Sequence, residues 1–312
     1  MSGVGHGKAI LLGEHAVVEG APALVSALPE GVIVEAGPGA PRLEIEVPGW
    51  SMHVRNGDPG LPGEALAALC AALVEDGLPP EALEVKLSVE ARIPDRAGVG
   101  SSAALAVGLA RALAERAEYA PLLEEGADAR LEAIVAASEA VFHGRASGVD
   151  AAVAVHGGVG LFQPGRGFSP LTPGVPASLV VAHTGPKPPT REAVEHVRQR
   201  CRASAEARRA LQRLGDLAEA GEELLRAGDL RALGEAMDEA QHHLAFFDLS
   251  TPDLDAAVAA ARAAGALGAK LTGAGGGGCI VALCPVGEER PVAESLERRC
   301  PWVGSFPCEE KR

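Results

Sequence analysis

Residues 98–104 read Gly98-Val99-Gly100-Ser101-Ser102-Ala103-Ala104 and separate a strand-like segment from a helix predicted to run from Ser101 to about Tyr119. Glycines let a backbone approach a ligand closely. The first N–H groups of a helix have no intrahelical partner and lie at the positive end of its dipole. The stretch therefore predicts an anion site, most simply for phosphate, with the serine hydroxyls as further hydrogen-bonding groups or a metal ligand. The alternative is a tight turn with serine caps.

Two familiar phosphate motifs fit this sequence poorly. The spacing Gly98-x-Gly100-x-x-Ala103 matches the relaxed dinucleotide fingerprint, but the acidic residues that follow it lie within the predicted helix and not at the end of a second strand. Gly7-Lys8 resembles a P-loop, yet Ser2 and Ala9 stand where that motif has its first glycine and its hydroxyl residue. Neither a Rossmann site nor a P-loop is predicted.

Composition limits the number of domains, the classes of partner and the cellular location that we expect. The chain has 312 residues, which predicts about two domains. Its formal net charge of −14 disfavours nucleic acid or an anionic membrane as a partner, because phosphate contacts need clustered lysines and arginines. The six cysteines form no C-x-x-C pair and are interpreted as reduced thiols of a cytoplasmic protein. No signal peptide opens the chain, and its longest uncharged stretch, residues 167–186, contains four prolines.

Hydrophobic periodicity predicts an α+β protein in two domains, residues 1–170 and 171–312, divided within a proline- and glycine-rich segment. Two short apolar runs before this segment, residues 151–155 and 158–162, are predicted to form a hairpin. In the second half, helices between about residues 191 and 244 are predicted to be punctuated by Gly215, Gly221 and Gly228. The predicted strands are residues 32–35, 43–47, 83–89, 179–183 and 279–284. The other predicted helices cover about residues 66–76 and 128–142, and a further helix begins at Pro252.

Two further runs carry polar groups at the ends of predicted elements. In residues 5–20, Lys8 begins a predicted strand and Glu14-His15 follow it; alternatively, these are a solvated lysine and a turn-capping pair. In residues 138–150, Glu139 faces the inner margin of a helix, where a carboxylate needs a partner such as a cation. Asp150 follows a glycine-containing turn and could act as a general base. The alternative is a solvated glutamate and an Asx-turn.

The last run, residues 270–279, reads Lys270-Leu271-Thr272-Gly273-Ala274-Gly275-Gly276-Gly277-Gly278-Cys279. Ordering so many glycines costs much conformational entropy. We therefore expect a loop that presses against a ligand or another loop, with a flexible hairpin as the alternative.

Taken together, these runs resemble the GHMP kinases, named for galactokinase, homoserine kinase, mevalonate kinase and phosphomevalonate kinase. Residues 7–20 are most similar to the mevalonate kinases, and the resemblance extends from residue 5 to residue 279. It implies an N-terminal domain like domain 2 of ribosomal protein S5 and a ferredoxin-like C-terminal domain. It also implies ATP-dependent phosphorylation of mevalonate to 5-phosphomevalonate, with ATP and mevalonate as partners, and leaves room for a homodimer.

The resemblance also implies residue roles. Ser102 and Glu139 would hold Mg²⁺, Asp150 would accept the proton of the substrate hydroxyl, and Lys8 would stabilise charge beside it. Glu14, His15 and Thr190 would bind the acceptor. The phosphate cradle would consist of Pro94, Gly98, Val99, Gly100, Ser101, Ser102 and Ala103.

Some positions depart from the family pattern. Arg96 stands where many members have the first glycine of the phosphate loop, which predicts a different entry to that loop. Pro188 replaces a common arginine, and Lys187 could supply the charge. The alternatives are another GHMP small-molecule kinase, for phosphomevalonate, a sugar or an alcohol, and a catalytically inert member that binds a ligand. The presence of Lys8, Asp150, Glu139 and Ser102 together argues against inertness.

Overall fold

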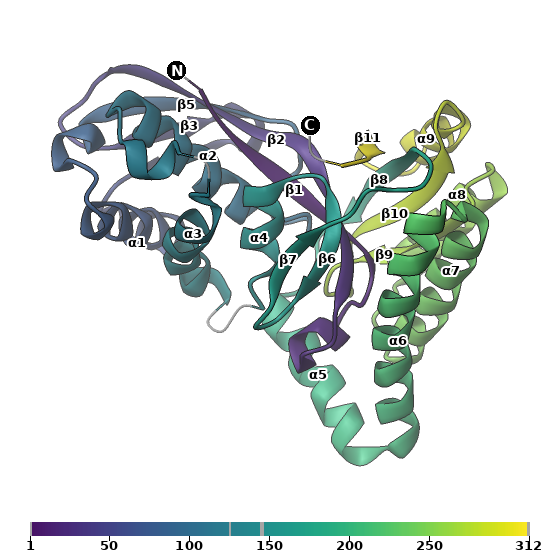
Figure 1. Cartoon of the computed structure of the whole chain (residues 1–312). Coiled ribbons are helices and arrows are strands. Elements are labelled where there is room, and N and C mark those ends of the chain that lie inside the picture. The colour runs from purple at the N-terminus through teal and green to yellow at the C-terminus, as the bar shows by residue number, and fades with distance from the viewer. Residues whose placement is uncertain (1, 125, 144–146, 311–312) are drawn as a thin grey trace. The chain divides into compact units, whose positions relative to one another are not determined.

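The computed structural model of the chain describes residues 2–124, 126–143 and 147–310. The chain divides into two compact units, and strands β1 (Ser2–Leu12) and β2 (Ala23–Gly39) contribute residues to both (Figure 1). The first unit comprises Met1–Gly7, Pro29–Asp95 and Gly100–His156, and the second comprises Lys8–Leu28, Arg96–Val99 and Gly157–Arg312. The boundary expected between residues 170 and 171 stays a prediction.

The first unit contains a strand layer built from alternating apolar residues. Strand β5 (Val85–Ala91) pairs antiparallel with β2 and parallel with β3 (Glu44–Val47), which pairs antiparallel with β4 (Met52–Arg55). Every second residue of β5 is buried from Val85 to Val89, as the period of two in the sequence predicts.

Helices α1 (Leu61–Asp76), α2 (Ser101–Arg116), α3 (Asp128–His143) and α4 (Val149–His156) complete this unit, and α2 packs against the other three. Glycines allow β1 and β2 to approach α2 closely. A Cβ at Gly5 would overlap the carbonyl oxygen of Ala104, and one at Gly108 would lie 2.8 Å from the Val34 side chain. Short 3₁₀ helices cover Pro48–Trp50, Pro80–Leu83 and Ala120–Leu122.

The predicted hairpin of residues 151–155 with 158–162 is wrong. Residues 151–155 belong to helix α4 and are fully buried, whereas β6 (Val159–Gln163) pairs with β7 (Gly167–Pro170) and with β2. A short apolar run that is buried on all sides has no polar face, so its periodicity cannot distinguish a helix from a strand.

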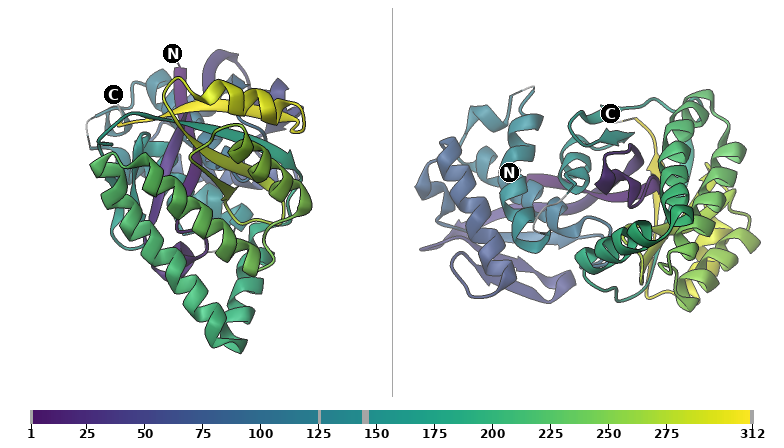
Figure 2. Two further views of the ribbon diagram at one scale, coloured as in Figure 1. Left: turned by 90° about the vertical axis from the view of Figure 1, so that its right-hand side faces the viewer. Right: turned by 90° about the horizontal axis from the view of Figure 1, so that it is seen from below.

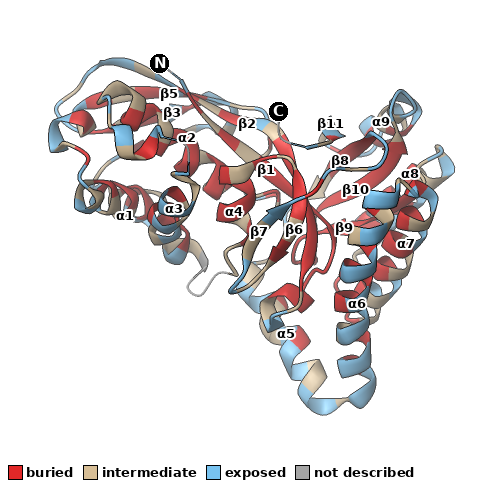
Figure 3. Ribbon diagram, in the orientation of Figure 1, coloured by how far each residue is buried: buried red, intermediate tan, exposed pale blue. Residues whose placement is uncertain are grey.

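The second unit has an antiparallel four-stranded sheet in the order β11-β8-β10-β9, with helices α7, α8 and α9 packed against its strands. Its inner strands, β8 (Ala177–Gly185) and β10 (Gly278–Pro285), and the edge strand β9 (Gly268–Thr272) are buried over most of their length (Figure 3). The other edge strand is β11 (Trp302–Cys308). The helices are α7 (Leu230–Phe246), α8 (Pro252–Ala263) and α9 (Glu289–Glu297).

Helices α5 (Thr190–Ala203) and α6 (Ala205–Ala227) form a helical pair that meets at Ser204 (Figure 2). Gly228 ends α6 in the left-handed conformation, as predicted. Gly215 and Gly221 instead lie inside α6, contrary to the predicted breaks. A Cβ at Gly221 would lie 2.5 Å from the Leu12 side chain, so this glycine serves close packing of the helix and not its termination.

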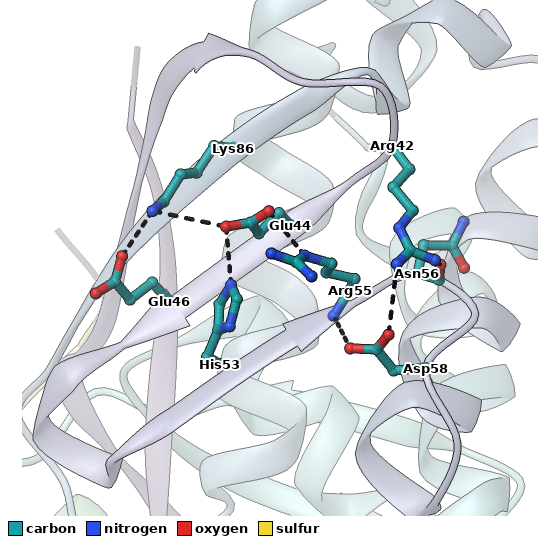
Figure 4. Close-up of polar contacts among 8 residues, drawn as sticks. All are labelled: Arg42, Glu44, Glu46, His53, Arg55, Asn56, Asp58 and Lys86. Atoms are coloured by element: carbon teal, nitrogen blue, oxygen red, sulfur yellow. Dashed lines mark hydrogen bonds and ion pairs between the residues drawn. The ribbon is translucent and has the colours of Figure 1, made fainter.

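The exposed face of β3, β4 and β5 carries a cluster of ion pairs centred on Glu44, called here the Glu44 cluster (Figure 4). Glu44 accepts hydrogen bonds from His53 at 2.8 Å and Arg55 at 3.0 Å, and these hold its pKa at about 2. Lys86 Nζ lies 2.9 Å from Glu46 and 3.6 Å from Glu44. Exposed pairs of this kind contribute little to stability individually.

No helix in the described ranges combines the length and the apolar character that a membrane crossing requires.

Candidate active site

The predicted Gly-Glu-His run forms a tight turn, residues 13–15, between β1 and the 3₁₀ helix η1 (Ala16–Glu19). We call it the Gly-Glu-His turn. Gly13 has φ 102°, and a Cβ there would lie 2.6 Å from the Pro22 carbonyl oxygen. His15 is not a glycine, yet its φ is 62°. A left-handed backbone costs an L-residue about 1–2 kcal/mol, so surrounding contacts must hold His15 in this conformation.

Glu14 is completely buried and forms an ion pair with Lys270 of β9, whose side chain is also completely buried. Burial raises the pKa of Glu14 and lowers the pKa of Lys270, and the attraction between the two charges opposes both shifts. The expectation that Glu14 contacts the substrate is not supported by this placement, because its carboxylate has no exposed surface.

The sequence motifs do not single out Lys270 as a site residue, although it begins the glycine-rich run of residues 270–279. The signal that could have found it is a lysine inside the buried strand Gly268–Thr272, because a charge in such a strand requires a partner. Which acid supplies that partner is decided by tertiary structure, since Glu14 lies 256 positions away along the chain.

His15 is buried, and its Nε2 lies 3.0 Å from the carbonyl oxygen of Ala274. Desolvation lowers the pKa of His15 to about 4. The imidazole is therefore neutral near pH 7. A carbonyl oxygen can only accept, so Nε2 carries the proton and Nδ1 is left as a hydrogen-bond acceptor.

A second connection to β9 lies beside this turn. The Thr272 hydroxyl accepts a hydrogen bond from the Ile10 N–H at 2.8 Å and donates to the Ile10 carbonyl at 3.1 Å. Both residues are buried, so both backbone groups of Ile10 are satisfied by one side chain. The end of β1 is thus fixed to β9 by directional bonds.

The glycine-rich loop, residues 273–278, is closely packed. Its five glycines have φ values between 75° and 134°, which L-residues with side chains rarely adopt. A Cβ at Gly275 would lie 2.7 Å from the Leu249 carbonyl oxygen, and one at Gly278 would lie 2.7 Å from that of Ala97. The prediction that this run presses against another loop is confirmed. The run also closes a hairpin, because β9 and β10 on either side of it pair antiparallel.

The phosphate loop, residues 94–104, keeps a glycine-like entry in spite of Arg96. That residue has φ 53°, so Arg96 adopts a conformation typical of glycine and carries the strain of a left-handed backbone. The N–H of Lys8 donates to the Val99 carbonyl at 2.8 Å, which ties β1 to this loop. The Lys8 side chain is buried, so the solvated lysine considered above is excluded.

Lys187 lies beside the same loop. Its Nζ is 3.5 Å from the position that a Cβ on Gly98 would occupy, and it donates to the Thr190 hydroxyl at 3.1 Å. Thr190 is the first residue of α5, and Thr184 donates to the Gly278 carbonyl at 3.0 Å.

The remaining predicted site residues lie in the first unit, except Val99, which belongs to the second. Gly100, with φ 73°, is the N-cap of α2, so serine does not occupy the N-cap as the alternative required. Ser101 is buried, and Ser102 is half-buried in the first turn of α2. Glu139 is buried on α3, and Asp150 is half-buried in the first turn of α4. Both α3 and α4 pack against α2. Pro94 is half-buried, and the Val99 and Ala103 side chains are fully buried.

We expect the pKa of His15 to produce a pH dependence of stability. The unfolded chain binds a proton at this histidine near pH 6.5, whereas the folded chain binds it only near pH 4. The stabilisation is therefore complete above pH 6.5 and is lost as the pH falls towards 4, by about 3 kcal/mol in all. His15→Asn removes the titration while Asn tolerates a positive φ. Urea unfolding between pH 4 and 7 should show a flatter profile for this variant, and parallel profiles would contradict the assignment.

Comparison with known proteins identifies the family. A family model described as the GHMP kinases N terminal domain matches residues 63–158, and one described as GHMP kinases C terminal matches residues 222–301. A mevalonate kinase from Aeropyrum pernix is 37% identical over 302 residues, covering 93% of this chain and 90% of the relative. A mevalonate kinase from Pyrococcus furiosus is 33% identical with the same coverage.

A solved structure of L. major mevalonate kinase in complex with R-mevalonate superimposes with a TM-score of 0.83 at 27% identity, covering all of this chain and 96% of that one. The predicted α+β fold with GHMP kinase N- and C-terminal domains is thereby confirmed. By sequence over nearly its whole length and by fold, the chain belongs to the GHMP kinases and, within them, to the mevalonate kinase family.

Proposed function

We propose that this protein transfers the γ-phosphoryl group of ATP to mevalonate and forms 5-phosphomevalonate. The observation that carries the proposal is the 33–37% identity over 93% of the chain to relatives named mevalonate kinase. Phosphoryl transfer depends mainly on positioning the reactants and neutralising charge. The chain offers groups suited to both tasks: a helix N-terminus behind Gly100, a buried lysine and two acidic side chains on packed helices.

We propose Ser102 and Glu139 as the protein ligands of Mg²⁺. A hydroxyl and a carboxylate are hard oxygen donors of the kind this ion prefers, and Mg²⁺ commonly binds through one or two protein oxygens together with phosphates and water. Within the described ranges, no group of three His, Cys, Asp or Glu side chains could hold a metal ion, which accords with a site completed by the nucleotide. When bound, the ion would neutralise charge on the phosphates.

The roles of the other residues follow the same proposal. Asp150 accepts the proton of the acceptor hydroxyl, and Lys8 stabilises the charge that develops during transfer. The backbone from Gly98 to Ala103 cradles the phosphates, with Pro94 at its start. His15 and Thr190 bind the acceptor. Because His15 presents Nδ1 as an acceptor, it suits a hydroxyl of the substrate better than a carboxylate.

We also propose a functional division into residues 1–170 and 171–312 and a cytoplasmic location, in keeping with six free cysteines. Assembly as a homodimer stays an expectation from the family resemblance.

An acceptor panel tests the proposed reaction. Release of ADP should be fastest with mevalonate when phosphomevalonate, galactose and homoserine are offered at equal concentration. A preference for phosphomevalonate or a sugar would contradict the proposed acceptor and assign the protein to another GHMP kinase activity. Binding of ATP without turnover of any acceptor would favour the inert member.

We expect Ser102→Ala and Glu139→Gln each to weaken the use of Mg-ATP far more than they weaken folding, because each removes one oxygen from the proposed ion site. The Mg²⁺ concentration giving half-maximal activity should rise in both variants. Ser138→Ala, a neighbouring buried serine on α3, is the matched control. Unchanged activity and Mg²⁺ dependence in both variants would refute the assignment.

We expect Asp150→Asn to lower kcat by about 10²–10⁴-fold with ATP affinity near wild type, because Asn cannot accept the proton. Lys8→Met should cost a comparable factor. If both residues act in the same step, the fold-loss in kcat of the double variant is much smaller than the product of the two single-variant losses. Single-turnover kinetics measure these rates. The control is Asp58→Asn, which changes an aspartate that lies 3.7 Å from Arg42. A loss of only a few-fold, or strict multiplication of the two effects, would mean that the proton leaves by another route.

A further inference from the structure

We propose that the buried Glu14–Lys270 ion pair is a positioning device that holds the Gly-Glu-His turn so that His15 can bind the acceptor. Glu14 and Lys270 are then positioning residues, which act through His15 without touching the substrate. This inference rests on the proposed function, because it assigns the pair to the acceptor side of that site.

The surroundings of Lys270 leave its ammonium group nothing to offer a ligand. Its Nζ donates to Glu14 Oε1, to the Leu271 carbonyl at 2.7 Å and to the Ile10 carbonyl at 3.5 Å. These three acceptors use all three donors of a lysine. The side chain also has no exposed surface. A role for Lys270 in direct contact with phosphate or carboxylate is therefore excluded.

Lys270 is the main partner of Glu14. Its Nζ donates to Glu14 Oε1, whereas Oε2 is buried and makes no hydrogen bond with any described residue. The Glu14 backbone and the charge of Lys8 also favour the carboxylate, but less than Lys270 does. If Lys270 is removed, the buried carboxylate loses its ion-pair partner, which destabilises the folded state, or the carboxylate must leave its place.

The pair is coupled to His15 by the chain itself. Glu14 and His15 are consecutive, and they bind two positions, Lys270 and Ala274, that lie four residues apart on β9 and the glycine-rich loop. His15 also holds a left-handed backbone. Two anchors on neighbouring residues can hold such a strained turn, whereas one anchor leaves the turn free to relax.

A purely stabilising role explains the pair poorly. Replacing a buried ion pair with apolar side chains of similar size is often neutral or stabilising, so a core needing only stability does not require these charges. Two charges joined by directional bonds instead specify one geometry, and a positional error of about 1 Å at a reacting group can cost about 10²-fold in rate.

The experiment compares Lys270→Met and the double variant Glu14→Gln/Lys270→Met in the full-length chain, each with and without His15→Ala. We expect Lys270→Met to raise KM for mevalonate by about tenfold or more, with a smaller change in kcat and none in KM for ATP. The double variant carries no unpaired buried charge, so it should recover folding stability while KM for mevalonate stays raised. In the His15→Ala background, breaking the pair should change KM less than about twofold.

Lys86→Met is the matched control. Lys86 is also ion-paired to a glutamate, but it belongs to the exposed Glu44 cluster (Figure 4). We expect its kinetic constants to stay at wild-type values.

A second readout needs no substrate. Nitrogen-15 NMR of the histidines in the wild type should show His15 as a neutral imidazole protonated at Nε2, with a pKa near 4. In the double variant we expect the preference for one tautomer to weaken, because the ring is no longer held against Ala274. We also expect the pKa to move towards 6.5, because a released ring is less desolvated. Loss of the Lys270 charge also raises this pKa, so the tautomer is the readout that is specific to positioning.

Several outcomes would overturn the inference. The first is that the His15 signals and KM for mevalonate are unchanged in the double variant. The second is that breaking the pair raises KM for mevalonate just as much in the His15→Ala background. The third is that no variant of the pair folds, which would assign the pair to stability. The proposed function fails separately if the wild type does not phosphorylate mevalonate. In that case the His15 signals can still differ between the wild type and the pair variants.

Discussion

An ion pair without exposed surface, Glu14–Lys270, is the constraint on which the Gly-Glu-His turn depends. Two charges taken out of water must be paired and hydrogen-bonded, because desolvation of either one alone costs several kcal/mol. The pair can therefore form only where β1 ends against β9. Thr272 and Ala274 add directional bonds on the same segment, to Ile10 and His15. The Gly-Glu-His turn is thus held by a short stretch of chain more than 250 residues away.

Close approach of backbone to backbone is the second requirement. The glycine-rich loop packs its main chain against carbonyl groups of Leu249 and Ala97, where a Cβ would not fit. In the first unit, Gly5 and Gly108 bring β1 and β2 onto α2 in the same way. A chain with only 3% aromatic residues has few large side chains to fill wide gaps, so dense packing must come from small residues and short distances.

Backbone strain occurs in the segments that the buried ion pair and the close backbone packing hold in place. His15 and Arg96 both hold left-handed backbones without being glycine. Non-glycine residues in this conformation persist only when neighbouring contacts determine it. For His15 those contacts are the bond to Ala274 and the anchored Glu14. The same burial that holds the ring keeps it neutral, because desolvation lowers its pKa to about 4.

The sequence by itself determined the α+β class, most strands and helices, the glycine turn before α2 and the family resemblance, because these depend on local periodicity and on ordered short motifs. It also predicted that Glu139 would face inward. It could not determine whether residues 151–155 form a strand or a helix, since a run buried on all sides has no polar face. Nor could it show that Glu14 is buried against Lys270. Only the tertiary structure decided that, because the partner of a buried charge is chosen by which strands meet in space and not by spacing along the chain.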